Sequence, residues 1–279
     1  MPLKYLIFLP LILLTSLTPA NRVEGGTDNL YLGYASTLDK FVDSRGMVDY
    51  KSLKTNRGGL DSFVVALGNL DGELLASWSE QEQIAFWLNA YNAFTLKAII
   101  DNYPIKGGFL TSLVYPGNSI RQIDGVWDKL EFAVAGEAQT LERIEHEILR
   151  VRFEEPRIHM ALVCAAMGCP QLRNEPYYGS RLDSQLDDQT LRFLADPAKF
   201  RIDRDKGKVY LSSIFEWFGD DFVSVFSDTG PVDKFDSPRN AVLNFITGYL
   251  DTDRHNYIDQ QNYKIESVKY DWSLNERSQ

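Results

Sequence analysis

The chain of 279 residues carries 29 Lys and Arg against 39 Asp and Glu, a formal net charge of −10 at pH 7. A surface this acidic repels phosphate backbones and anionic lipid head groups, and no cluster of Lys and Arg reverses the charge locally, so we expect no nucleic-acid partner. The length suffices for one domain with a substantial hydrophobic core.

The first twenty residues have the plan of a secretory signal peptide. Lys4 supplies a positive start, residues 6–17 are largely apolar, and residues 18–20 are small residues of the kind found at a cleavage site. The apolar stretch is shorter than the roughly 18 to 20 residues that span a bilayer. We therefore expect cleavage after Ala20, a flexible tether over residues 21–29, and a periplasmic or secreted protein with no stable membrane insertion.

Apolar periodicity predicts the first helices of the mature chain. Two helices are expected over residues 30–41 and 59–70. The clearest helix covers residues 80–102, where Ser79 and Glu82 form a capping box and a following proline stops the helix. This helix is apolar on almost every face, so we expect it to be buried on most sides.

The downstream half mixes helices with short strands. Helices are predicted over residues 141–153, 181–195, 213–225 and 240–250, strands over 130–134, 157–164 and 263–270, and a hairpin over 200–211. The order is not a βαβ repeat, which favours the α+β class. We expect a single, mainly helical domain over residues 30–279 around a small, mostly antiparallel sheet, with helix 80–102 buried at its centre.

Four segments in order carry a family resemblance: Ala85-Phe86-Trp87-Leu88-Asn89-Ala90-Tyr91-Asn92-Ala93, residues 141–150 around Ile144-Glu145-His146, residues 156–170 ending in Cys169-Pro170, and the closing residues 270–275. Together they resemble the family called domain of unknown function 547. The resemblance covers roughly residues 40–275. It implies a coherent fold and carries no assigned activity. Met167-Gly168 stand where the family often has Ser or Lys before Cys-Pro.

Cys164 and Cys169 are the only cysteines of the chain. In an oxidising compartment two cysteines with four intervening residues, one of them Gly, can close a disulfide. The alternative is a nucleophilic thiolate at one of them. Together with His146 and His159 they would make a reasonable zinc set, but the spacing matches no C-x-x-C or H-x-x-x-H pattern. We therefore predict no metal and no cofactor.

Two histidines lie close in sequence to these cysteines. His159 interrupts an apolar segment, where its ring needs a polar partner. His146 follows Glu145 beside the apolar stripe of its helix, and is either tuned as a base or part of an ion-pair network. On a strand, His159 and Cys164 would point to opposite faces roughly 16 Å apart. Cys169 could instead fold back towards His159, and Cys164 could meet His146.

Asn89 and Asn92 lie on one face of the expected central helix. A buried amide without partners costs roughly 1 to 3 kcal/mol, so each must be hydrogen-bonded inside the protein. They either tie the helix to neighbouring backbone or point into a site. We predict that one of them lies within hydrogen-bond reach of His159 or His146, with a cysteine nearby at the edge of a pocket. The acidic pair Asp220-Asp221 fits a solvated helix end.

Three functions compete for this set of residues. The leading hypothesis is a thiol-dependent hydrolase or acyl-transferase, with Cys169 or Cys164 as nucleophile, His159 or His146 as base, and Glu145, Asn89 or Asn92 orienting the imidazole. The alternative is a non-catalytic periplasmic binding or interaction module with a structural disulfide. A zinc-dependent hydrolase comes third. The expected partner is a small molecule or peptide of unknown identity.

Overall fold

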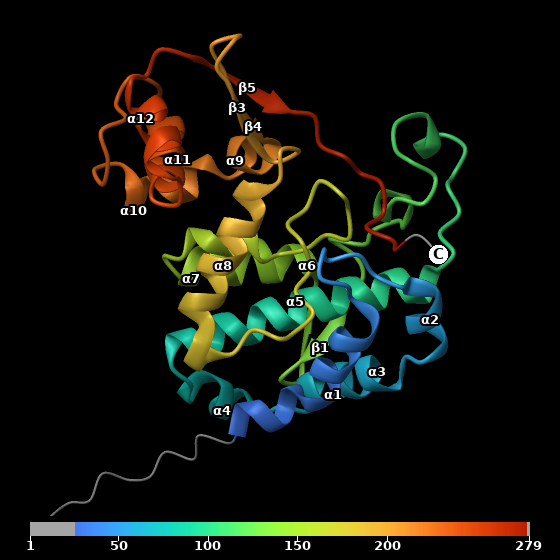
Figure 1. Ribbon diagram of the computed structural model, residues 1–279. Coiled ribbons are helices and arrows are strands. Elements are labelled where there is room, and N and C mark those ends of the chain that lie inside the picture. Colours follow the sequence, from blue (N-terminus) through green and yellow to red (C-terminus); the bar gives the residue numbers. More distant parts are fainter. Residues whose placement is uncertain (1–25, 278–279) are drawn as a thin grey trace, which may run out of the picture.

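The computed structural model describes residues 26–277 (Figure 1). The predicted signal peptide and residues 21–25 of the tether lie outside the described residues. Helix α1 (Gly26–Phe41) begins before the expected start at residue 30. It therefore includes the end of the predicted tether, because the polar first turn of a helix and a polar tether have the same composition.

Helix α5 (Glu80–Asn102) runs through the centre of the helical part and confirms the predicted buried helix (Figure 1). The capping box is formed: the Ser79 hydroxyl accepts from the Glu82 N–H, and the Glu82 carboxylate accepts from the Ser79 N–H. The helices that precede α5 along the chain are α2 (Tyr50–Thr55), α3 (Gly58–Gly68) and α4 (Gly72–Ser77). Helices α2 and α3 both contact α5.

A connection with two 3₁₀ turns, η1 (Thr111–Leu113) and η2 (Ile120–Gln122), leads from α5 to an antiparallel hairpin. The hairpin is β1 (Phe132–Val134) and β2 (Glu137–Gln139). The helix predicted over residues 141–153 consists of α6 (Leu141–Arg143), η3 (Ile144–Leu149) and α7 (Arg150–Arg152). Its middle part, η3, is a π-helix, a rare form that is frequent at functional sites.

The strand predicted over residues 157–164 is not formed. A 3₁₀ helix, η4 (Pro156–Met160), takes its first half, and an irregular segment follows. The Asn92 side chain hydrogen-bonds the Ala161 carbonyl and the Val163 N–H. These backbone groups are thus bonded to a helix side chain instead of a neighbouring strand. A short apolar run does not distinguish these two kinds of burial.

The rest of the chain builds a three-stranded sheet and its helices. Strands β3 (Phe200–Asp203) and β4 (Lys208–Ser212) pair antiparallel, and β5 (Lys264–Val268) pairs parallel with β4. The helices are η5 (Gly179–Arg181), α8 (Leu182–Ala195), α9 (Ser213–Trp217), η6 (Gly219–Phe222), α10 (Val223–Phe226), α11 (Ser237–Thr247) and α12 (Thr252–Asp259). The predicted class, mainly helical α+β with small and mostly antiparallel sheets, is confirmed.

The buried apolar side chains form two clusters. The α5 core contains those between residues 31 and 186 except Met160, together with Leu274. The sheet core contains Met160 and those between residues 193 and 263. Tyr270, in the C-terminal segment after β5, packs against both. Within residues 26–277, no helix is both long and apolar enough to cross a membrane.

Candidate functional site

A cavity of about 280 Å³ is lined by residues of the α5 core and by residues packed in the sheet core. Both cysteines, His146, His159 and Glu145 line it, so the structure brings these predicted residues together. Most of its remaining wall is aromatic: Tyr91, Trp127, Trp217, Phe218, Tyr270 and Trp272. We call this space the aromatic cavity.

The two cysteines are bonded to each other, with their Cα atoms 6.1 Å apart. The disulfide alternative therefore describes this structure, and a thiolate nucleophile exists only after reduction. The two sulfurs are not equivalent in access. Cys164 is half-buried, whereas Cys169 is only 3% exposed. The zinc set is not formed, because both sulfurs are bonded to each other. Among the described residues, no other group of three or more His, Cys, Asp and Glu side chains suits a metal ion.

Tyr270 holds the disulfide from the C-terminal segment. Its hydroxyl lies 3.1 Å from each sulfur, and the Cys164 N–H donates to the Cys169 sulfur at 2.9 Å. Burial, with a smaller contribution from the charge of Glu145, raises the pKa of Tyr270 above its ordinary value. The hydroxyl therefore keeps its proton and donates to sulfur. Cys169 thus has two donors, one from the backbone and one from Tyr270.

The loop between the cysteines is clamped to the same C-terminal segment. The Met167 N–H donates to the Ser273 carbonyl at 2.8 Å, and the Gly168 N–H to the Asp271 carbonyl at 2.7 Å. A Cβ atom on Gly168 would lie 2.7 Å from the Tyr270 ring. Real Cβ atoms do not approach that closely, so the glycine is needed for the ring to reach the disulfide.

A chain of charged and polar contacts joins the two histidines. The Asp221 carboxylate lies 2.7 Å from His159 Nε2 and forms two hydrogen bonds with Arg150, of 2.6 and 2.8 Å. Arg150 Nη1 also lies 2.8 Å from His146 Nδ1. Burial alone would raise the pKa of Asp221, but the hydrogen bonds from Arg150 and His159 outweigh it and hold that pKa well below the ordinary value. Asp221 is therefore an ionised acceptor and not a solvated helix end.

The hydrogen-bond partners of the two histidines indicate which ring nitrogen carries a proton in each. Because a guanidinium only donates, His146 Nδ1 accepts, and the ring proton lies on Nε2. Because Asp221 only accepts, His159 Nε2 donates, which leaves Nδ1 as the ring nitrogen that can accept a proton. No hydrogen bond from a residue within 26–277 engages that Nδ1 atom. His159 is therefore the candidate base of the cavity and His146 the candidate donor.

The two asparagines of α5 lie outside the polar chain. Asn89 bonds both the carbonyl and the N–H of Tyr177, at 2.7 and 2.9 Å. Asn92 bonds the Ala161 carbonyl at 3.1 Å and the Val163 N–H at 2.9 Å. The expected hydrogen bond to a histidine is therefore not made, because a primary amide has one acceptor and one donor end and both are used by backbone. Asn92 still positions the cavity wall, since Val163 directly precedes Cys164.

Glu145 has a different partner from the one expected. It accepts a hydrogen bond from the Tyr91 hydroxyl at 3.0 Å, while Asp221 takes the place beside His159. Glu145 and His146 both face the cavity from the π-helix η3. Asp221 and Tyr270 were not predicted as members of the site, because they lie 62 residues beyond His159 and 101 residues beyond Cys169, where no spacing rule applies. Arg150 lies one turn after His146, where an ion-pair network was one of the two interpretations.

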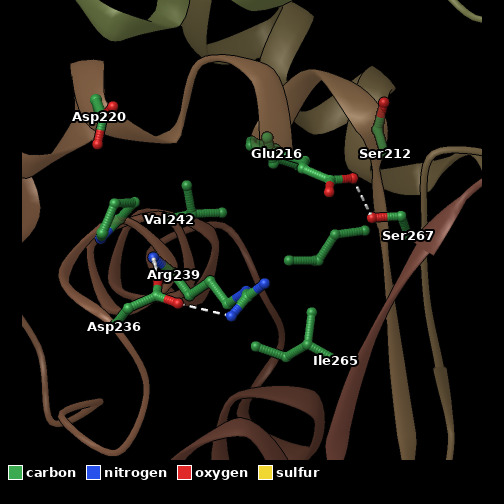
Figure 2. Close-up of a pocket in the computed structure, with 11 residues that line it drawn as sticks. Ser212, Glu216, Asp220, Asp236, Arg239, Val242, Ile265 and Ser267 are labelled. Carbon is green, nitrogen blue, oxygen red and sulfur yellow. Dashed lines mark hydrogen bonds and ion pairs between the residues drawn. The ribbon is translucent and has the colours of Figure 1, made fainter.

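A second pocket, of about 350 Å³, lies between α9, α11 and the strands β4 and β5 (Figure 2). We call it the sheet pocket. Three of its four charged groups have partners within the pocket: Arg239 bonds Asp236 at 2.6 Å, and Glu216 accepts from the Ser267 hydroxyl at 2.5 Å (Figure 2). None of the residues predicted as functional lines it.

Residues 75–194 match the model of a family described as "Protein of unknown function, DUF547". This match confirms, over that stretch, the resemblance read from the sequence. It includes both cysteines, both cavity histidines and Arg150, whereas Asp221 and Tyr270 lie beyond it. No curated protein and no solved structure matches the chain.

Proposed function

We propose that the protein performs thiol–disulfide exchange at the Cys164–Cys169 pair, on a small molecule or peptide that enters the aromatic cavity. One observation carries the proposal. The disulfide forms part of the wall of a ligand-sized cavity and joins a half-buried Cys164 to a buried Cys169, whose sulfur alone accepts a hydrogen bond from the Cys164 N–H. A disulfide whose only role is to stabilise the fold does not require this asymmetry.

The asymmetry sets the direction of attack. An incoming thiolate attacks the Cys164 sulfur, a new S–S bond forms, and the Cys164–Cys169 bond breaks with its electron pair going to Cys169. The better the leaving thiolate is stabilised, the faster this step runs. The Cys164 N–H and the Tyr270 hydroxyl already point at the sulfur that receives the charge. The proton of the incoming thiol goes to His159 Nδ1, and Asp221 stabilises the resulting imidazolium.

A second thiolate completes the reaction. It attacks the substrate sulfur of the mixed disulfide, and Cys164 leaves as a thiolate. The two protons released by the two substrate thiols then protonate Cys164 and Cys169. Two substrate thiols are then oxidised to a disulfide by two electrons, and the protein disulfide is reduced to two thiols. The same steps in reverse, with a disulfide as substrate, restore the Cys164–Cys169 bond.

A thiol-dependent hydrolase is the second candidate. It is favoured by the His159–Asp221 pair, which has the contacts of a base and its orienting carboxylate, and by the position of His159 in the wall of the same cavity as Cys164. In the reduced protein the Cys164 thiolate would attack an acyl carbon in place of a sulfur. Burst release of p-nitrophenol from p-nitrophenyl acetate by reduced protein, lost in Cys164→Ser, would favour this activity.

The deciding experiment traps the mixed disulfide. Native oxidised protein is mixed with glutathione, quenched with acid, alkylated and mapped by mass spectrometry. We expect glutathione on Cys164, and a stable adduct there when Cys169→Ser protein is given oxidised glutathione. Cys164→Ser should form its adduct on the order of 100-fold more slowly, a barrier about 2.7 kcal/mol higher, since only a buried sulfur remains. Reduction that occurs only when the protein unfolds would instead identify a non-catalytic module with a structural disulfide.

A further inference from the structure

We infer that Arg121 is the anion-binding residue of the aromatic cavity, and that the substrate carries a carboxylate which binds this guanidinium while its sulfur reaches Cys164. The substrate class is thus a small thiol acid or its disulfide. The inference rests on the proposed exchange reaction for the sulfur, and on the surroundings of Arg121 for the carboxylate.

Arg121 is held in a cage of aromatic rings at the cavity wall. Its guanidinium carbon lies 4.6 Å from the ring centre of Tyr115, 5.2 Å from that of Trp127 and 5.1 Å from that of Trp272. Its Nη2 also donates to the Tyr115 hydroxyl at 2.9 Å. The side chain is exposed, so such a long chain would otherwise sample many rotamers. The cage restricts them before any ligand arrives, which lowers the entropy lost on binding.

The positive charge of Arg121 is not used inside the protein. In the part of the chain that the structure describes, no ion pair includes Arg121, although the chain has ten more acidic than basic residues. The rings beside it carry no net charge. A planar guanidinium with five N–H donors matches a carboxylate in two parallel hydrogen bonds, and only one nitrogen is occupied by Tyr115. The guanidinium N–H groups that do not bond Tyr115 can therefore bind the carboxylate of a ligand.

The volume of the cavity and the charge of one lining residue restrict the size and the charge of the ligand. Its volume of about 280 Å³ lies near the lower end of the range from roughly 300 to 1,000 Å³ that holds small ligands, which favours a molecule of few heavy atoms. Glu145 lines the same cavity, and its carboxylate accepts from Tyr91. A second negative group on the ligand would face that charge. The expected substrate therefore has one carboxylate, one thiol and a short or flat connection between them.

A matched set of thiols tests the inference on the full-length protein. The set is 3-mercaptopropionate, 2-mercaptoethanol and cysteamine, which differ mainly in an anionic, neutral or cationic end. The rate at which each reduces the native disulfide is divided by its rate with 4,4′-dithiodipyridine, which removes the intrinsic reactivity of the thiol. At low salt we expect roughly a 10-fold preference for 3-mercaptopropionate over 2-mercaptoethanol, the gain from one charge-assisted contact.

Two matched variants assign the preference to Arg121. Arg121→Gln should abolish it and Arg121→Lys should keep only part of it, since Lys lacks the planar fork. Arg239→Gln, in the sheet pocket, should leave it unchanged, because that guanidinium is bonded to Asp236. Equal normalised rates for the three thiols, a preference for cysteamine, or an unchanged preference in Arg121→Gln would each overturn the inference.

A ligand without sulfur tests the anion site independently of the proposed exchange reaction. Phenylacetate has a carboxylate and a flat ring but no sulfur, and its binding can be followed by the fluorescence of the tryptophans that line the cavity. Saturable binding that weakens roughly 10-fold in Arg121→Gln would support the anion site even if no thiol reduced the disulfide. No binding, or equal binding by both proteins, would refute it even if the exchange reaction were observed.

Discussion

Two cavities flank helix α9, and they differ in what their charged groups contact. Ile214 and Trp217 of this helix face the aromatic cavity, while Phe215 and Glu216 face the sheet pocket (Figure 2). In the sheet pocket, Arg239 and Glu216 have polar partners in the same pocket. In the aromatic cavity, Arg121 has no acidic partner among residues 26–277, and His159 Nδ1 accepts no hydrogen bond from them.

The two cavities differ in volume as well as in their polar contacts. The sheet pocket is the larger of the two, at about 350 Å³ against about 280 Å³. Its ion pair joins Arg239 of α11 to Asp236, the N-cap residue three positions earlier, so this pair forms within local sequence. The groups of the aromatic cavity come from segments far apart in the chain, and several keep a free donor or acceptor. Free polar groups around a reactive disulfide are what an incoming ligand can use.

The largest effect is expected from removing the packing on either side of the aromatic cavity. Trp87 is 5% exposed in the α5 core, and Phe245 is 1% exposed in the sheet core. Replacing either by Ala should lower the free energy of unfolding by about 3 to 5 kcal/mol. We expect both variants to lower the midpoint of one urea transition, as in a single domain. Two transitions, each moved by only one variant, would contradict the predicted single domain. A loss below about 1 kcal/mol for Trp87→Ala would mean that α5 contributes little packing.

A matched pair of carboxylates compares the two cavities directly. Asp221→Asn should cost about 2 to 3 kcal/mol, because it leaves Arg150 and His159 without their shared, partly buried partner. Asp236→Asn should cost less than about 0.5 kcal/mol, since its ion pair with Arg239 is half-exposed and Asn still caps α11. Urea unfolding of both variants at pH 7 measures the difference. Equal losses would remove the distinction between the two sites.

The pH dependence of that pair has a definite sign. The pKa of Asp221 is lowered in the folded protein, so its contribution to stability is complete above the ordinary carboxyl pKa of 3.8 and is lost as the pH falls below it. We expect the stability difference between the wild-type protein and Asp221→Asn to shrink between pH 5 and pH 3. A difference that grew with acidity would show that the folded protein favours the neutral carboxyl.

Replacing the Tyr270 hydroxyl should affect exchange more than stability. Tyr270→Phe keeps the ring against Gly168 but removes one of the two donors to the Cys169 sulfur. We expect glutathione to reduce the native disulfide about 10-fold more slowly, equivalent to the loss of one hydrogen bond worth about 1.4 kcal/mol. Ser267→Ala, which removes a hydroxyl from the sheet pocket, is the matched control and should leave the rate unchanged. An unchanged rate in Tyr270→Phe would mean that the hydroxyl does not stabilise the leaving thiolate.

The smallest expected effect is that of a chelator. Incubation with EDTA should shift the thermal midpoint by less than about 1 °C, because the thiols of the zinc set considered from the sequence are consumed by the disulfide. Metal analysis of the purified protein provides the second measurement. One tightly held zinc per chain, or unfolding on chelation, would contradict the expectation.

Much of the secondary structure could be read from the sequence, because the free energies that decide it are local. The capping box at Ser79 and Glu82 involves residues three apart, and the hairpin of β3 and β4 turns at Gly207, which has a φ of +59°. The even apolar character of α5 was enough to predict its burial. The cysteines, His146, His159 and Glu145 were also predicted to form one site, because all lie within one short stretch that folds back on itself.

The partners of those residues were decided only by the tertiary structure. Asp221 contacts His159 from 62 residues further along the chain, and Tyr270 contacts Cys169 from 101 residues further along. The choice between strand and 3₁₀ helix at residues 156–160 depended in the same way on α5, since Asn92 bonds the backbone that follows. A buried polar group must be paired, but its sequence neighbours do not say by which group. That depends on which distant segment packs against it, and so only the assembled fold decides it.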